Sequence, residues 1–331
     1  MSVPVVAFFN NKGGVGKTTL VHHLSWMYAD LGLRVVAADL DPQCNLTAAF
    51  LDEDRLEQIF PENGQHETIF GSLQPLIRGT GDVTPPKLQI ITPPLAVIVG
   101  DMGLSTFEDQ LSESWPKCLD RDERAFRVTS SLWRILQAGA EEHQANVILV
   151  DLGPNLGAIN RAALIASDYV VIPLGPDLFS LQGLRNLGPA LRRWREGWGE
   201  RVLKNPVREL ALPKGSIKPA GYILMRHSIR LDRPVKAFER WMAKMPAVYL
   251  KSVLDQPDAP VPTLETDPNC IDKLKDYRSL MPLAQEVRKP MFSLKPADGA
   301  LGAHAKAVQD SYGDFKKVAR SIASRTGISI P

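Results

Sequence analysis

The stretch Val3–Thr19 reads VPVVAFFNNKGGVGKTT, and it decides the fold of this chain. Its first part, Val3–Phe9, is apolar, β-branched and aromatic, which predicts a buried strand. A glycine-rich loop follows, and Thr18–Leu31 then carries apolar residues at helical spacing. Arg34–Leu40, RVVAADL, is a second apolar run of strand length. Since both strands are apolar throughout rather than alternating, the pattern predicts a strand–helix–strand unit of a covered parallel sheet.

The loop between this strand and this helix suits a bound phosphate group. It consists of Lys12, Gly13, Gly14, Val15, Gly16, Lys17, Thr18 and Thr19. Glycines let backbone N–H groups approach phosphate oxygens, and the start of the helix adds positive potential. Lys17 is placed to reach the β- and γ-phosphates of a nucleotide, and the Thr18 hydroxyl suits Mg²⁺. We therefore expect these residues to bind Mg-ATP, with Lys17 in a catalytic role.

Strands and helices alternate along the rest of the chain. The apolar runs predict strands at Leu88–Ile91, Val147–Asp151, Tyr169–Leu174 and Ala220–Met225. Helical spacing predicts helices at Arg124–Gln144, Asn160–Ser167, Leu181–Trp198, Arg233–Met245 and Gly302–Arg325. Loops are expected at Lys204–Pro219 and Gln256–Asn269, and the polar, Pro- and Gly-rich stretch Asp52–Arg124 gives no clear pattern apart from the strand at Leu88–Ile91. The alternation predicts an α/β fold with a doubly wound, mostly parallel, twisted sheet and helices on both faces.

Composition describes a globular protein with an uneven charge. No apolar run approaches the ~20 residues of a membrane span, and no signal peptide is apparent, so we expect a cytoplasmic protein. Three well-separated cysteines indicate reduced thiols. Residues 1–150 carry 11 basic and 19 acidic residues, a net charge of −8, whereas residues 151–331 carry 28 and 18, a net charge of +10. This asymmetry indicates either polyanion binding or a solvated basic surface.

A second lysine, Lys12, opens the loop and carries a family resemblance. With this lysine, KGGVGKTT resembles the signature of the deviant Walker A ATPases, which include the partition protein ParA and the division-site protein MinD. The resemblance implies a P-loop NTPase fold and a homodimer that forms in ATP. It also implies that Lys12 is catalytic and reaches the phosphates of the partner subunit, as an arginine finger does.

Two further blocks resemble the same family. Residues 39–45, DLDPQCN, resemble its D-x-D-P-Q-x-N segment, which implies that Asp41 is catalytic, orients the attacking water and binds Mg²⁺ through water. Asp39 is either structural or an alternative for that role, and we favour a structural role. Residues 147–157, VILVDLGPNLG, resemble the strand and D-x-P-P-x-x-G tail of Walker B, which implies that Asp151 is a further Mg²⁺ ligand, again through water.

The resemblance extends along nearly the whole chain, so we expect a single ParA-like domain over residues 1–331. Its weaker parts are Asn160–Pro173, Phe179–Leu184, Arg288–Pro290 and Phe315–Ile322. Residues 50–130 match least, and residues 227–278 look elaborated, either as a partner surface or as a plain surface extension. There are two departures from the family pattern. Gly153 replaces a proline, and Met225 and Arg226 stand where the family often reads adenine with an asparagine.

The family divides by what its ATP-bound dimer binds. Residues 324–331, SRTGISIP, lack the apolar face of a membrane-binding helix, so membrane targeting is not expected. Basic helical stretches favour non-specific double-stranded DNA instead, through Arg192, Arg193, Arg195, Arg230, Arg233 and Lys236. A slow, partner-stimulated partition ATPase with a ParB-like adaptor, associated with the nucleoid, is our first hypothesis. A MinD-like or protein-cargo positioning ATPase and a metabolic ATP-dependent synthase of the same fold are the alternatives.

Overall fold

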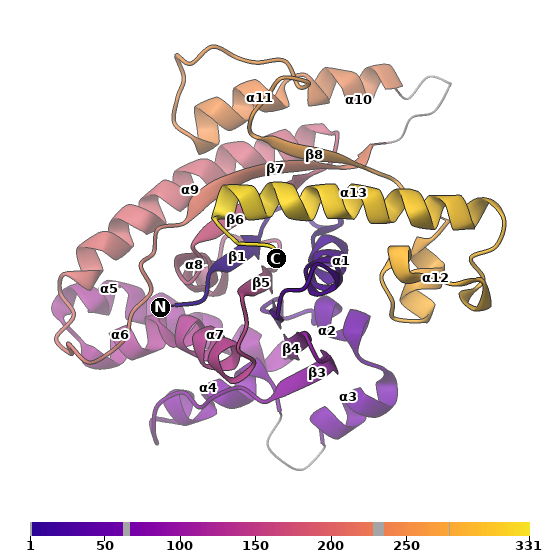
Figure 1. The fold of residues 1–331 in the computed structure, drawn as a ribbon. Coiled ribbons are helices and arrows are strands. Elements are labelled where there is room, and N and C mark those ends of the chain that lie inside the picture. Colours follow the sequence, from indigo (N-terminus) through magenta and orange to yellow (C-terminus); the bar gives the residue numbers. More distant parts are fainter. Residues whose placement is uncertain (1, 62–66, 228–234, 278) are drawn as a thin grey trace.

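One sheet organises the part of the chain that the computed structural model describes, residues 2–61, 67–227, 235–277 and 279–331. Its eight strands lie in the order β3-β4-β2-β5-β1-β6-β7-β8 (Figure 1). All neighbours pair in parallel except β3 and β4, which are antiparallel. The strands are β1 Val5–Phe8, β2 Val35–Asp39, β3 Leu88–Thr92, β4 Leu95–Ile98, β5 Val147–Asp151, β6 Tyr169–Leu174, β7 Lys218–His227 and β8 Cys270–Lys275. The predicted doubly wound, mostly parallel α/β fold is confirmed.

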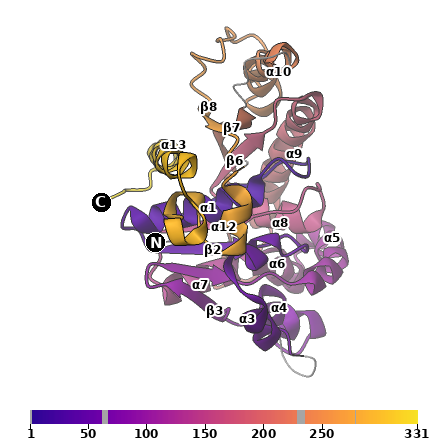
Figure 2. The same ribbon diagram turned by 90° about the vertical axis from the view of Figure 1, so that its right-hand side faces the viewer.

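Helices cover both faces of this sheet, as Figures 1 and 2 show. The α-helices are α1 Lys17–Asp30, α2 Asn45–Phe50, α3 Glu53–Ile59, α4 Ile69–Arg78, α5 Glu108–Lys117, α6 Glu123–Thr129, α7 Ser131–Glu142, α8 Ala158–Ile165, α9 Leu178–Val202, α10 Val235–Met242, α11 Met245–Val248, α12 Met281–Glu286 and α13 Ala303–Thr326. Shorter turns are η1 Met102–Phe107, η2 Cys118–Asp120, η3 Tyr249–Val253, η4 Met291–Ser293 and η5 Pro296–Asp298. Among the described helices none is long and apolar enough to cross a membrane.

The core consists of two apolar layers, one on each side of the strands. One layer packs α4 to α9 against the sheet and includes the fully buried Trp198 of α9. The other packs α1, α2 and α13 against the opposite face, with Tyr28 of α1 donating its hydroxyl to the Ala319 carbonyl of α13 at 2.9 Å. Because the strands are buried on both faces, their apolar runs show no alternation, as expected for a parallel sheet.

Several predicted elements have different bounds. The helix expected at Arg124–Gln144 is two helices, α6 and α7, and the Ser130 hydroxyl at their junction donates to the Phe126 carbonyl at 2.7 Å. The helix expected at Arg233–Met245 is α10 followed by α11, and its start lies outside the described residues. Strands β4 and β8 were not predicted. The remaining predicted strands and helices are present with shifts of a few residues at their ends.

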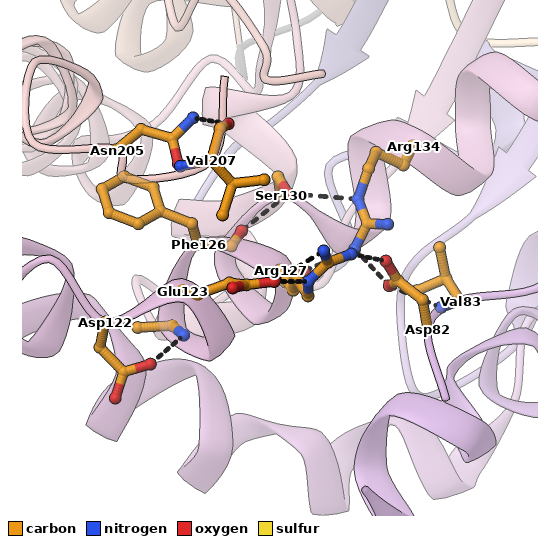
Figure 3. Close-up of polar contacts among 11 residues, drawn as sticks. Asp82, Val83, Asp122, Glu123, Phe126, Arg127, Ser130, Arg134, Asn205 and Val207 are labelled. Carbon is orange, nitrogen blue, oxygen red and sulfur yellow. Dashed lines mark hydrogen bonds and ion pairs between the residues drawn. The ribbon is translucent and has the colours of Figure 1, made fainter. Parts of the chain in front are cut away.

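The stretch 52–124, for which only the strand at Leu88–Ile91 was predicted, forms short helices besides β3 and β4, and an ionic cluster anchors it at Asp82. Asp82 receives bonds from two arginines on the neighbouring helices, Arg127 of α6 and Arg134 of α7, the latter at 2.8 Å (Figure 3). Arg127 also pairs with Glu123 at 2.7 Å. Burial alone would raise the pKa of Asp82, but the bonds from Arg134 and Arg127 outweigh it, so the pKa lies below its ordinary value. The cluster fixes the chain leading into β3 against α6 and α7.

Candidate functional site

The phosphate loop lies at the middle of the sheet, where β1 ends and α1 begins. Gly14 and Gly16 adopt φ angles of +71° and +91°, a conformation that favours glycine. Lys17 is the first residue of α1, so the free backbone N–H groups of the first helical turn face the loop, where an anion can bind. Asn10 fixes the entry: its side-chain amide donates to the Pro173 carbonyl at 2.7 Å, and its oxygen accepts from the Lys12 N–H at 2.9 Å.

Strand register brings the predicted carboxylates to this loop. Phe8, the last residue of β1, pairs with Asp151 of β5, which also pairs with Asp39 of β2. Asp151 is buried, and its Oδ2 accepts from the Thr18 hydroxyl at 2.6 Å. Its other oxygen, Oδ1, is buried without a hydrogen-bond partner among the described residues. Burial and the neighbouring Asp39 both raise the pKa of Asp151.

Asp39 and Asp41 differ in what they contact. The Asp39 carboxylate is fully buried and accepts from the backbone N–H and the hydroxyl of Thr47, both at 2.8 Å. These bonds tie β2 to α2, and a structural role for Asp39 stays a prediction. Asp41 instead lines the cavity beside the loop, where one of its oxygens accepts from the Gln43 N–H at 3.0 Å. A Cβ on Gly153 would lie 3.2 Å from that oxygen, so the glycine leaves room for the carboxylate.

Lys17 lies within the same group of charges. Its side chain is only 7% exposed, and burial lowers its pKa, while the nearby Asp151 and Asp41 act in the opposite direction. An ammonium group held this way has its donors available for an anion in the cavity. The structure thus brings Lys17, Thr18, Asp41 and Asp151 together, as the sequence predicted.

Two adjoining cavities surround the loop. The first has a volume of about 570 Å³. Its lining comprises Gly13, Gly14, Gly16, Lys17, Thr18, Thr19, His22, His23, Asp41, Gln43, Asn45, Ala48, Ala49, Pro154, Met281, Ala284, Gln285 and Lys289. The second, of about 490 Å³, contains Met225 and Tyr277 and shares Gly16, Thr19, Met281 and Gln285 with the first. We call them the phosphate cavity and the second cavity.

Lys12 lies apart from both cavities. Its Nζ contacts Asp177 Oδ2 at 2.6 Å, and both side chains are about one third exposed, at 33% and 30%. Asp177 caps α9 by accepting from the Ser180 N–H at 3.0 Å. Phe179, whose ring centroid lies 5.9 Å from Lys12 Nζ, is 70% exposed, and Leu178 beside it is 45% exposed. The lysine and an exposed apolar patch therefore lie together at the start of α9.

The predicted DNA-binding residues divide into three groups. Arg193 and Arg195 are exposed on α9. Arg192 is not free, because its Nη1 donates to the Ser252 carbonyl at 2.7 Å and its Nη2 lies 3.5 Å from Asp255. Arg230 and Arg233 lie outside the described residues, as do the side chains of Lys236 and Arg226. Thus Arg193 and Arg195 remain as exposed candidates, and Arg192 holds α9 to η3.

Sequence reasoning missed the contribution of α12 and its following turn. Gln285 and Lys289 line the phosphate cavity, although about 270 residues separate them from the loop. From the sequence, Arg288–Pro290 was only a weaker part of the family resemblance, and no contact of this segment with the loop was predicted. His23 was also missed as a link: its Nε2 accepts from the Met291 N–H at 3.0 Å, and its Nδ1 lies 2.7 Å from the Thr19 carbonyl.

Comparisons with known proteins agree with this geometry. The model of the AAA domain family matches residues 3–202. The chromosome partitioning protein ParA of Caulobacter vibrioides is 30% identical over 198 residues, which cover 60% of this chain and 66% of that protein. The sporulation initiation inhibitor protein Soj of Bacillus subtilis is 30% identical over 184 residues, 55% of this chain and 62% of Soj. A putative replication protein A of Rhizobium rhizogenes is 26% identical over 54% of this chain. The matched region spans only 42% of that relative's length.

Solved structures match over the full length. A Corynebacterium diphtheriae protein superposes with a TM-score of 0.70 at 23% identity, covering 98% of this chain and 99% of that one. Cyanothece McdA, solved with ATP, superposes with a TM-score of 0.63 at 16% identity, covering 99% and 98%. At these identities the likeness establishes the fold. Together with the family match over residues 3–202 and the ParA relatives, it follows that this chain belongs to the ParA/MinD family of P-loop ATPases.

Proposed function

We propose that this chain is a ParA-type ATPase that slowly hydrolyses Mg-ATP to ADP and phosphate and is stimulated by a partner. The observation that carries the proposal is the convergence of Lys17, Thr18, Asp41 and Asp151 at the phosphate loop. Lys17→Ala should abolish ATP binding, because it removes the buried ammonium beside the loop. Lys306→Ala, at an exposed position of α13, is the matched control. Near-normal ATP affinity of the Lys17 variant in calorimetry would overturn the proposal.

The residues present fit a magnesium ion. The Thr18 hydroxyl is a suitable direct ligand, and the unpartnered Asp151 Oδ1 is suited to a metal-bound water. Asp41 adds a second carboxylate on the cavity wall. The described residues contain no group of three or more His, Cys, Asp or Glu side chains placed to hold a metal alone. This agrees with an ion that takes the rest of its shell from phosphates and water, where it neutralises phosphate charge.

Asp41 is the residue that we assign to the attacking water. It lines the phosphate cavity, and its carboxylate is held at one oxygen by the Gln43 N–H, which leaves the other free to accept from a water. Asp41→Ala should therefore bind ATP and hydrolyse it much more slowly, as measured by single-turnover release of phosphate. If Asp41→Ala instead fails to bind ATP, Asp41 has a structural role, and another residue must orient the attacking water.

The second cavity is suited to the nucleotide base. It adjoins the loop through Gly16 and Thr19, and Met225 and Tyr277 give it an apolar wall. The Met225 methyl carbon lies 3.1 Å from the position that a Cβ on Gly16 would take, so this side chain packs directly on the loop. We assign Met225 to contact with adenine, and Arg226 remains a proposed neighbour. Met225→Asp should weaken ATP and ADP binding equally.

ATP-dependent dimerisation is supported by the surface around Lys12. Phe179, Leu178 and Leu156 expose 70%, 45% and 37% of their surfaces after β6 and β5, at the edge where the loop opens. A second copy would cover these side chains, and Lys12 could exchange Asp177 for the partner's nucleotide. Lys12→Ala should retain ATP binding but lose dimer in light scattering with ATP. An ATP-bound dimer with Lys12 still on Asp177 would contradict the trans role.

Non-specific DNA is the proposed partner of the dimer. Arg193 and Arg195 are exposed, and the half of the chain that contains them carries a net charge of +10. Replacing both by Ala removes four cations from a dimer and should flatten the slope of log affinity against log salt by about 3 to 4. Arg192→Ala is the contrasting variant, since it should loosen η3 more than it changes the salt slope. DNA affinity that is independent of ATP would refute the proposed switch.

Three further assignments complete the proposal. We assign residues 1–331 to a single ATPase domain. A ParB-like adaptor or a cargo protein is the expected stimulating partner, and the nucleoid in the cytoplasm is the expected location. The Caulobacter relative's name, a chromosome partitioning protein, supports a role in segregation or positioning. Pull-down of neighbouring gene products with ATP-loaded protein, followed by an ATPase assay, tests whether any of them stimulates turnover.

A further inference from the structure

Helix α12 covers the boundary between the two cavities beside the loop. Met281 and Gln285, one helical turn apart, line both the phosphate cavity and the second cavity. Figure 2, which is viewed from the side that carries α12, shows this helix in front of α1 and the sheet. A ligand with its phosphates on the loop and its base in the second cavity would therefore pass beneath these two side chains.

The chain turns sharply after α12 and presents Lys289 to the phosphate cavity. Arg288 adopts a φ of +49°, and the Lys289 N–H donates back to the Ala284 carbonyl at 3.1 Å. Of the described residues, Lys17 and Lys289 are the two lysines that line this cavity. Lys289 is absent from the lining of the second cavity. Its cation therefore belongs with the phosphates rather than with the base.

Lys289 is at present paired with Asp298. Its Nζ lies 2.9 Å from Asp298 Oδ1, and the two side chains are 44% and 11% exposed. The other carboxylate oxygen of Asp298 accepts from the Lys295 N–H at 2.9 Å, so Asp298 keeps a partner if Lys289 leaves. An ion pair whose lysine is 44% exposed is weak, whereas a nucleotide offers several anionic oxygens at one place.

The turn is also fastened to the phosphate loop. His23 of α1 donates from Nδ1 to the Thr19 carbonyl at 2.7 Å and accepts at Nε2 from the Met291 N–H at 3.0 Å. Thr19 lies in the first turn of α1, so the bond to its carbonyl fixes the imidazole on its own helix. Met291 is two residues beyond Lys289, so the second bond joins the turn to α1 and holds Lys289 beside the cavity.

We propose that Lys289 is a nucleotide-binding residue whose ammonium exchanges Asp298 for a phosphate oxygen of the nucleotide bound in the same subunit. The inference deepens the proposed ATPase function and rests on it. It assigns to the C-terminal segment a contact made in cis, distinct from the contact across a dimer expected of Lys12. Asp298 acts as a competitor for the ammonium rather than as part of the site.

Binding of Mg-ADP, measured by calorimetry, tests this exchange. Lys289→Ala should weaken binding about tenfold, because one charge-assisted contact is lost. Lys289→Arg, which keeps the positive charge, should restore part of the affinity, and Lys306→Ala should behave as wild type. Asp298→Ala should tighten binding a few-fold, because the competitor is gone, and it should have no effect in the Lys289→Ala background.

The outcomes separate this inference from the function on which it rests. If Asp298→Ala weakens binding as much as Lys289→Ala does, the pair only holds the turn, and the inference is wrong. Normal affinity of Lys289→Ala, with binding lost in Lys17→Ala, also overturns the inference but leaves the ATPase assignment intact. Binding retained in Lys17→Ala overturns the assignment itself. Thermal melting of each variant shows whether it is folded.

Discussion

Acidification should lower the folding stability of this protein through His23, a buried residue of α1 whose ring faces η4. Both ring nitrogens are committed, one to the Thr19 carbonyl and the other to the Met291 N–H, so only the neutral ring satisfies both partners. Burial lowers the pKa of His23 from 6.5 to about 4. A proton added at Nε2 would face the Met291 N–H, donor against donor.

The magnitude follows from the difference between the two pKa values. As the pH falls below 6.5, the unfolded chain binds a proton at this histidine and the folded chain does not. The free energy of unfolding therefore falls by about 1.4 kcal/mol per pH unit until the folded pKa is reached. Between pH 6.5 and pH 4 this one residue costs about 3 kcal/mol of stability. Its contribution is fully present above pH 6.5.

Urea unfolding of the wild type and of His23→Gln at about pH 7 and about pH 4.5 measures the effect. Glutamine can donate to one partner and accept from the other, but it does not titrate. The variant should be less stable than wild type at neutral pH and should lose about 2 to 3 kcal/mol less on acidification. The carboxylates titrate in both proteins. His22 also titrates in both, and its pKa is lowered first by burial and only second by His23, so the difference between the two proteins reports chiefly on His23.

Phe315→Leu is the matched control. The Phe315 ring stacks on His23 with centroids 4.8 Å apart. This variant loses packing without losing a titrating group, so its stability should drop by a similar amount at both pH values. Equal acid sensitivity of wild type and His23→Gln would refute the reasoning.

Four further variants test the packing of α9, the position of Asp41 and the ionic cluster at Asp82. Gly188→Ala on α9 should lower the free energy of unfolding by about 2 to 4 kcal/mol, because its Cβ would lie 1.8 Å from the Ser252 carbonyl oxygen. On the same helix, a Cβ at Gly199 would meet nothing within 4 Å, so Gly199→Ala should raise the free energy of unfolding by about 0.5 to 1 kcal/mol. Gly153→Ala should slow ATP hydrolysis about tenfold at unchanged ATP affinity, because its Cβ would press on Asp41; equal rates would show that the carboxylate yields freely. Asp82→Asn should lower the free energy of unfolding by about 1 to 2 kcal/mol at neutral pH and leave it unchanged once the pH is well below 3.8. The reason is that the pKa of Asp82 is lowered in the folded protein, so its stabilising effect disappears as the carboxylate is protonated. Urea unfolding at a series of pH values measures both effects.

The sequence predicted the centre of the sheet well because local and long-range signals agree there. The apolar runs at β1, β2, β5 and β6 are buried on both faces, and each is closed by a polar residue or a glycine within two positions of the end of the strand. Strands β4 and β8 were harder to predict. Strand β4, LAVI, is apolar throughout, but it is only four residues long and directly follows Pro93 and Pro94. Strand β8, CIDKLK, lies at an edge of the sheet, and three charged residues interrupt its apolar ones, so it lacks the continuous apolar pattern on which the prediction relied.

For the site, residues within a motif were predictable and those brought in by folding were not. Lys17 and Thr18 begin the helix that follows β1, and Asp41 and Asp151 stand at or just beyond the ends of β2 and β5, at the edge of the sheet where the fold class places ligands. His23 and Lys289 lie on a helix face and a turn with no distinctive spacing, and their roles depend on contacts across more than 260 residues. Arg192 shows the converse error, since its place in a basic run does not reveal that its guanidinium binds a carbonyl.

The ion pair between Lys12 and Asp177 has a consequence for how readily the lysine can be released. A carboxylate that loses its cation usually becomes a liability, but Asp177 stands at the first turn of a 25-residue helix, where the aligned peptide dipoles favour negative charge. It also keeps the Ser180 N–H at 3.0 Å and the Ser180 hydroxyl at 3.4 Å. The first turn of α9 therefore still stabilises the Asp177 carboxylate after Lys12 has moved to another anion, and no unpaired charge remains. Breaking this ion pair should therefore require little free energy.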